Sequence, residues 1–132
     1  MTWRAGSSPA YWSSFDDFSV RSESTILGTK ELFYLLDENG GALENGDRVY
    51  LTNWEGRYLD TCHVQVFASA PTRDPKCNGL RIFFDPSNQE RFRLEMYNDF
   101  LIGSANNDTY YGGQVEMLFR DQTLYNLRMI RR

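Results

Sequence analysis

Aromatic side chains lie beside amides and carboxylates at two places in the sequence. The first group is Asn53, Trp54, Glu55, Arg57 and Asp60, and the second is Asn106, Asn107, Asp108, Tyr110, Tyr111 and Gln114. A sugar presents a weakly apolar C–H face and a rim of hydroxyl groups, so an aromatic ring beside a planar amide or carboxylate suits it. Both groups are therefore candidate carbohydrate-binding sites. An exposed ring can also anchor a protein partner or fold back onto the core, and these alternatives stay open.

The residue types that catalysis or metal binding requires do not occur in a suitable arrangement. His63 is the only histidine and follows Cys62 directly. On a strand these two side chains point to opposite faces, whereas a nucleophile needs a base that a third group orients. The segment from Asp37 to Gly41 begins like a calcium loop but lacks the later ligand spacing. The sequence predicts no enzyme, no metal site and no cofactor.

Cys62 and Cys77 are the only cysteines, and their spacing fits no zinc or redox motif. A disulfide between them would close a loop of about 15 residues and contribute about 3 kcal/mol in the chain-entropy model. The first residues lack the apolar segment of a secretory signal. Because disulfides are rare in the cytoplasm, we expect a cytoplasmic protein with two free thiols. Secretion by another route, or as part of a toxin complex, stays open.

Composition and charge restrict the classes of partner. The chain has 132 residues, of which 41% are hydrophobic and 15% aromatic, enough for one domain with a single core. A net charge of −4 argues against a nucleic-acid partner, which normally needs a clustered basic face. No apolar run approaches the roughly 18 residues of a membrane-spanning helix, so we expect no membrane span.

The strands that would position the first group of site residues follow from a period of two. Val49 and Leu51 alternate with polar neighbours, residues 53–56 have the composition of a turn, and residues 57–60 resume an extended run. This pattern predicts a β-hairpin with Trp54 at its tip. Similar runs predict strands at 18–21, 31–36, 64–70, 80–84, 91–97, 100–103, 115–119 and 124–130. No segment keeps a helical period, so the class is all-β.

The strand pattern recurs about every 44 residues, which predicts internal repeats. The matching positions are Val49 and Leu51 with Phe92 and Leu94 at an offset of 43, Leu59 with Leu101 at 42, Ile82 and Phe84 with Leu127 and Met129 at 45, and Phe33 and Leu35 with Ile82 and Phe84 at 49. Three repeats of four short strands indicate a β-trefoil in one domain, residues 1–132, with repeats of about 1–45, 46–88 and 89–132. Another sandwich or barrel with regular strand spacing is the alternative. The expected core is Val49, Leu51, Leu59, Ile82, Phe84, Leu94, Leu101 and Leu127.

One part of the sequence resembles a known family. The segments 46–53, 56–61, 68–74 and 80–83 are similar to one repeat of the β-trefoil lectin-like (ricin B-like) modules, although the Gln-x-Trp signature is absent and its strand reads Arg81-Ile-Phe-Phe. The resemblance extends over about residues 33–85. It implies a non-enzymatic module that binds a glycan or glycoprotein through loop sites. Trefoils also serve as protease inhibitors and as cytoskeletal or toxin-complex modules, so a protein partner is the alternative.

Overall fold

The protein is built from strands. The computed structural model describes residues 2–5, 11–24, 28–62, 65–96, 101–104, 115–118 and 127–130, and within them there is no α-helix, only a short 3-10 turn, η1 (Thr29–Glu31). The twelve strands are β1 (Thr2–Ala5), β2 (Tyr11–Ser14), β3 (Val20–Ser24), β4 (Tyr34–Asp37), β5 (Arg48–Thr52), β6 (Tyr58–Asp60), β7 (Phe67–Ala70), β8 (Leu80–Asp85), β9 (Asn88–Glu95), β10 (Leu101–Ser104), β11 (Val115–Leu118) and β12 (Leu127–Ile130). The predicted all-β class is confirmed.

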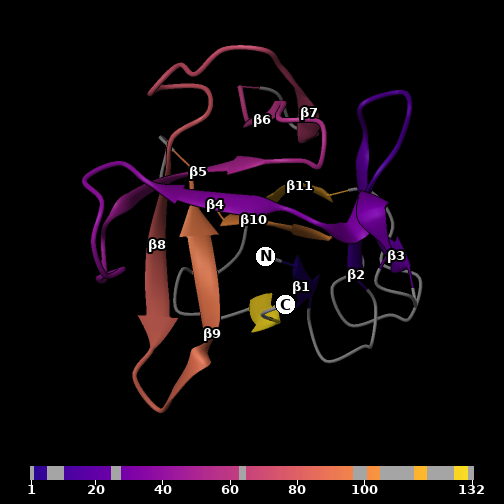
Figure 1. The fold of residues 1–132 in the computed structure, drawn as a ribbon. Coiled ribbons are helices and arrows are strands. Elements are labelled where there is room, and N and C mark those ends of the chain that lie inside the picture. The colour runs from indigo at the N-terminus through magenta and orange to yellow at the C-terminus, as the bar shows by residue number, and fades with distance from the viewer. Residues whose placement is uncertain are drawn as a thin grey trace.

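All twelve strands belong to one hydrogen-bonded network of antiparallel pairs. The main path runs β3-β2-β1-β12-β9-β8-β5-β6-β7, β4 pairs with β5, and β10 pairs with β9 and β11. Strand β1 pairs with β12, so the two ends of the chain lie side by side, as Figure 1 shows. Figure 1 also shows β8 and β9 as a long hairpin that projects away from β4 and β5. No described helix is long and apolar enough to cross a membrane.

Two of the ladders have the same local pairing. The β5·β8 ladder pairs Arg48 with Arg81 and Val49 with Leu80, and the β9·β12 ladder pairs Arg91 with Arg128 and Phe92 with Leu127. A shift of 43 residues therefore carries β5 onto β9, and a shift of 47 residues carries β8 onto β12. The structure thus repeats not only the strand pattern but also the pairing between strands.

Two of the predicted repeat offsets are wrong by two residues. Leu35 pairs with Leu51 in the same way that Ile82 pairs with Leu94, so the shift from β4 to β8 is 47 residues rather than 49. The shift from β8 to β12 is likewise 47 rather than 45. Both errors are two residues, because an alternating pattern cannot distinguish two registers that place the same residues on the same face.

A third correction concerns the counterpart of Leu59. Tyr58 pairs with Thr52 as Leu101 pairs with Glu95. Leu101 therefore corresponds to Tyr58, and the counterpart of Leu59 is Ile102, which is fully buried as Leu59 is. A one-residue slip moves a side chain to the opposite face of a strand, and leucine at both positions made the wrong match look right.

The core contains most of the side chains that the sequence predicts for it. Val49, Leu51, Leu59, Ile82, Leu94 and Leu127 are buried, and Phe84 is partly buried against them. The side chain of Leu101 lies outside the described residues. The core also includes Trp12, Val20, Phe33, Val66, Ala68, Leu80, Phe92, Met96 and Ile102. Residues from all three predicted repeats therefore contribute to one buried cluster.

A disulfide joins Cys62 and Cys77, whose Cα atoms are 4.9 Å apart, so the expectation of two free thiols is wrong. The backbone already brings these two segments together. The amide and the hydroxyl of Thr61 both donate to the carbonyl oxygen of Cys77 at 2.8 Å. Asn78 Nδ2 also donates to the carbonyl oxygen of Leu59 at 3.0 Å. The predicted compartment does not determine which sulfurs lie close together, whereas this local geometry decides whether they can meet.

Candidate functional site

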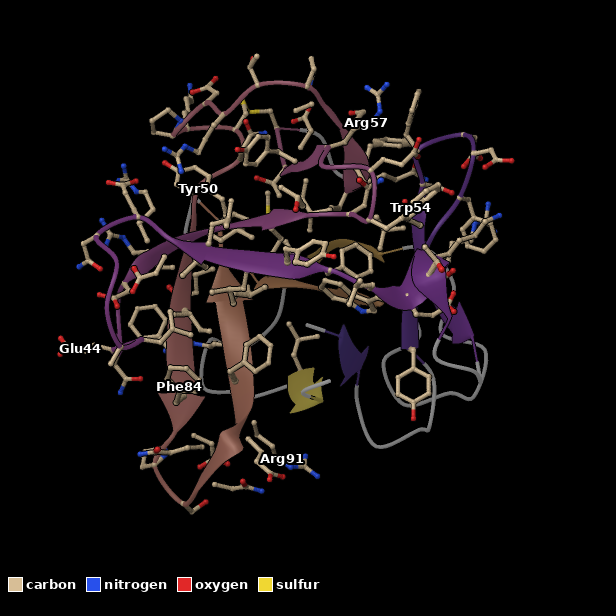
Figure 2. The ribbon with its side chains drawn as sticks, viewed as in Figure 1. Glu44, Tyr50, Trp54, Arg57, Phe84 and Arg91 are labelled. Carbon is tan, nitrogen blue, oxygen red and sulfur yellow. A yellow bond between two sulfur atoms is a disulfide. The ribbon has the colours of Figure 1, made fainter. Side chains whose placement is uncertain are left out.

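The two predicted groups of site residues have different outcomes. Asn53, Trp54, Glu55, Arg57 and Asp60 all lie on or beside the β5–β6 hairpin, with residues 53–57 forming its turn. Figure 2 shows Trp54 and Arg57 at this end of the molecule. The second group, Asn106, Asn107, Asp108, Tyr110, Tyr111 and Gln114, lies outside the described residues, and so does His63. Their roles stay predictions.

The buried side chain of Asn53 stabilises the hairpin turn through hydrogen bonds. Its Oδ1 accepts hydrogen bonds from the backbone amides of Glu55 and Arg57, both at 3.0 Å, and its Nδ2 donates to Ser14 Oγ at 3.0 Å. Gly56 has φ +81°, a conformation that glycine adopts at little cost. The Asn53 side chain is only 1% exposed. It therefore fixes the turn and does not reach the surface where a ligand would lie.

Trp54 and its neighbours form the exposed end of the hairpin. Trp54 is 41% exposed, and Glu55 is exposed beside it. The Arg57 guanidinium lies over the ring of Phe18, with its Cζ 5.0 Å from the ring centroid, and Nη1 donates to the carbonyl oxygen of Ser69 at 3.5 Å. The position of Arg57 is thus set by a cation–π contact and a hydrogen bond to β7. We call Trp54, Glu55, Arg57 and Phe18 the tip surface.

Phe18 is a member of the tip surface that the sequence did not identify. The sequence predicts a strand from residue 18, but β3 begins at Val20 and Phe18 sits in the preceding turn. Phe18 has φ +69° and is the only non-glycine residue with a positive φ among the described residues. Its side chain is 39% exposed. For a bulky residue this conformation costs about 1–3 kcal/mol, and such strain occurs most often at functional sites.

Hydrogen bonds hold the Phe18 turn in this conformation. Asp17 Oδ1 accepts from the hydroxyl of Ser19 at 2.6 Å and from its amide at 3.0 Å. These two hydrogen bonds lower the pKa of the Asp17 carboxyl below its ordinary value, and the bond from the Ser19 hydroxyl has the larger effect. The carbonyl oxygen of Phe18 accepts from the amide of Ala68 at 2.8 Å, which ties this turn to β7. The Phe18 ring is therefore presented on a fixed backbone.

Asp60 belongs to the opposite end of β6. Its Oδ1 accepts from the amide of Cys62 at 3.0 Å. A ligand atom of Asp60 lies within 4.8 Å of the sulfurs of Cys62 and Cys77, a spacing that could suit a metal ion. The two sulfurs are bonded to each other in the disulfide, so they do not offer a pair of thiolates. Asp60 is thus separated from the tip surface by the length of β6.

Replacing Asn53 by alanine should lower the free energy of unfolding by about 1–3 kcal/mol, because it leaves turn amides and the Ser14 hydroxyl without their partner. Urea denaturation of both proteins measures this change. Glu55→Ala is the matched control in the same turn, and its effect should stay within about 0.5 kcal/mol because the side chain is exposed. Equal effects of the two substitutions would contradict the structural role of Asn53.

A cleft of about 620 Å³ is a second candidate site that the sequence did not predict. It lies between the loop that precedes β5 and the β8–β9 hairpin, and its lining residues are Ala42, Leu43, Glu44, Asn45, Phe84, Asp85, Pro86 and Gln89. Figure 2 shows Glu44 and Phe84 on this side of the molecule. The Phe84 amide donates to Asn45 Oδ1 at 2.8 Å and holds the two segments together. The cleft combines a ring with amides and carboxylates, but its two halves lie about 40 residues apart in the sequence.

No protein-family model matches the sequence, and a comparison with curated proteins gives no match either. The function of the chain is therefore inferred from its own geometry.

Proposed function

We propose that the domain is a β-trefoil with three repeats of four strands. The support is the repeated pairing of strands. In each proposed repeat one strand pairs with the first strand of the next, which gives the pairs β4·β5, β8·β9 and β12·β1. The pairs β5·β8 and β9·β12 share one register pattern, and the remaining strands form the hairpins β2·β3, β6·β7 and β10·β11. A pair between β1 and β4 would close the ring of six strands, and it is not among the described pairs. In Figure 1 the strands β6 and β7 lie on the far side of β5 from the β8–β9 hairpin.

We propose that this domain is a non-enzymatic, lectin-like module that binds a glycan through the tip surface. The observation that supports this most strongly is the exposed ring of Trp54 on a turn that Asn53 fixes from below. The ring can stack against the C–H face of a sugar, while Glu55 and Arg57 can bind its hydroxyl groups. Because the turn is already ordered, binding does not need to order it, and this lowers the entropic cost.

A protein partner is the second candidate. Among the residues whose side chains the structure describes, four large apolar side chains are exposed: Phe18, Tyr34, Leu36 and Trp54. Exposed aromatic rings of this kind often mark protein interfaces. A glycan array, repeated with competing free sugar, distinguishes the two functions. Saturable signals that free sugar removes support the glycan, whereas a silent array and the specific capture of one protein would favour the protein partner.

Replacing Trp54 by alanine should weaken glycan binding by about 1–3 kcal/mol, the range expected for an aromatic anchor at an interface. Its unfolding free energy should change by only about 0.5 kcal/mol, because the ring is exposed. Calorimetric titration with the best glycan of the array and urea denaturation measure the two quantities. Leu36→Ala, a substitution of another exposed apolar side chain, should leave the affinity unchanged. An unfolded Trp54→Ala protein would instead assign the ring to the core.

The cytoplasmic location stays a prediction, and the disulfide between Cys62 and Cys77 weighs against it. Disulfides persist mainly in oxidising compartments such as the cell exterior. We therefore propose that the module works in an oxidising compartment, where a lectin-like module would also meet the glycans of cell surfaces. Mass spectrometry of the protein after alkylation in its native compartment would show whether the two sulfurs are bonded there.

A further inference from the structure

A second cavity, of about 380 Å³, is lined by three positively charged side chains, although the protein as a whole is acidic. Its lining residues are Arg48, Pro75, Lys76, Gly79, Leu80, Arg81, Glu95 and Met96, and we call it the basic pocket. The three cationic side chains come from β5, from the loop before β8 and from β8 itself. The chain as a whole has a net charge of −4, so this concentration of cations runs against its average composition.

Two of the three cations face each other across a strand pair. Arg48 of β5 is the direct partner of Arg81 of β8, so both side chains leave the same face of the sheet. Like charges directly opposite each other on paired strands are destabilising. An anion bound between the two arginines would relieve this repulsion.

The neighbouring acceptors neutralise these arginines only in part. Glu38 Oε2 lies 3.8 Å from Arg48 Nη1, but the same oxygen accepts a shorter bond, of 2.7 Å, from the hydroxyl of Tyr50. Arg81 Nη1 donates to the carbonyl oxygen of Gly46 at 2.9 Å, a neutral partner. Among the described residues, no carboxylate lies within ion-pair distance of Arg81. Both guanidinium groups keep donors for a further acceptor, because each carries five N–H groups.

The carboxylate that lines the pocket is already paired. Glu95 Oε2 accepts from Arg93 Nε at 2.7 Å, and the two side chains are only 11% and 14% exposed. Glu95 is also the cross-strand neighbour of Arg81, but its short bond is to Arg93. Since Glu95 pairs with Arg93, its carboxylate does not form an ion pair with Arg48 or Arg81.

The loop that carries Lys76 is held rigidly against the pocket. A Cβ atom on Gly79 would collide with the carbonyl oxygen of Pro75 and lie 3.3 Å from Arg48 Cδ, so glycine allows the close approach of loop and strand. Asp74 and Asn78 bridge the loop, with the Asp74 amide donating to Asn78 Oδ1 at 2.7 Å. The disulfide anchors the loop at Cys77. A pocket ordered in this way loses little entropy when it binds a ligand.

We propose that the basic pocket binds a tetrahedral oxyanion, the sulfate or phosphate group of a small molecule. Arginine donors in a fixed fork match the oxygens of such a group, and lysine adds a point charge. The pocket is separate from the tip surface, because Arg48 is the first residue of β5 whereas Trp54 lies in the turn beyond its last residue, Thr52. Figure 2 likewise shows Tyr50, which lies on β5, well apart from Trp54 in the turn that follows this strand. The proposal therefore does not depend on glycan binding at the tip.

Calorimetric titration of the full chain with sodium sulfate and sodium phosphate, at constant ionic strength, tests this site. We expect saturable binding, and we expect Lys76→Gln and Arg81→Gln each to raise the Kd by at least about fivefold, because each removes a charged donor. The sequence has only two lysines, Lys30 and Lys76, so Lys30→Gln makes the same charge change away from the pocket. It should leave the Kd within about twofold, because only screened long-range charge is lost.

The source of the group is tested with glucose 6-sulfate, glucose 6-phosphate and glucose. Tighter binding of one ester identifies sulfate or phosphate as the natural group, and glucose should not bind the pocket. Trp54→Ala should keep its oxyanion affinity, so a failure of glycan binding at the tip would not be mistaken for a failure here. Equal Kd values for Lys76→Gln and Lys30→Gln, or the absence of saturable binding, would overturn the proposal.

Discussion

Replacing Leu59 by alanine should lower the free energy of unfolding by about 2–5 kcal/mol, the range measured for deleting a buried leucine side chain. Leu59 is fully buried in the core on β6. Its carbonyl oxygen accepts from Asn78 Nδ2 at 3.0 Å, and its Cα partner on β7 is Ala68. The backbone is therefore held from two sides and cannot collapse into the cavity, so the cost should lie toward the upper part of this range.

Urea denaturation with an unchanged m-value would measure this loss. Leu36→Ala, which removes an exposed leucine from β4, serves as the control and should cost less than about 1 kcal/mol. If Leu59→Ala also cost less than about 1 kcal/mol, Leu59 would not be part of the packed core, and the assignment of β6 would be wrong.

Reduction of the disulfide between Cys62 and Cys77 should lower the melting temperature by an amount on the order of 10 °C. The bond closes a loop with a sequence separation of 15 residues. Closing such a loop contributes about 3 kcal/mol by restricting the unfolded chain, and a domain of this size converts that into a shift of this order. Calorimetric scans with and without reductant measure the shift.

The matched control for the disulfide is the double variant Cys62→Ser with Cys77→Ser. It should melt near the temperature of the reduced protein and should not respond to reductant. Unchanged melting of the native protein in reductant, together with alkylation of both cysteines in the folded state, would contradict the presence of the bond.

Alternation along single strands predicted much of this fold. The pattern around Val49 and Leu51 identified β5, the turn that follows it and the exposed position of Trp54 at the tip. Pairing between distant strands was harder, because a shift of two residues preserves the pattern of each strand. The counterpart of Leu59 was misplaced by one residue, since only the pairing of Tyr58 and Leu101 with the neighbouring strands distinguishes Ile102 from Leu101.

In the candidate sites, too, the sequence predicted features that depend on neighbouring residues better than those that depend on contacts between distant segments. The residue types of Asn53 and Trp54 suit both a turn and a ligand, and only the hydrogen bonds assign Asn53 to the turn. Phe18 lies at the tip surface because its backbone has a positive φ, which no sequence pattern predicted. The pairing of Arg48 with Arg81 depends on the register of β5 and β8, so a single strand gives no sign of it.

The most direct test of the proposed function is a titration followed by the indole N–H signals of the ¹⁵N-labelled protein in NMR spectra. The ligand is the best glycan of the array, and the Trp54→Ala variant assigns the Trp54 signal. We predict that this signal shifts progressively and saturates, while the indole signal of Trp12, which is fully buried in the core, stays in place. Binding of the glycan without a shift at Trp54 would contradict recognition at the tip surface.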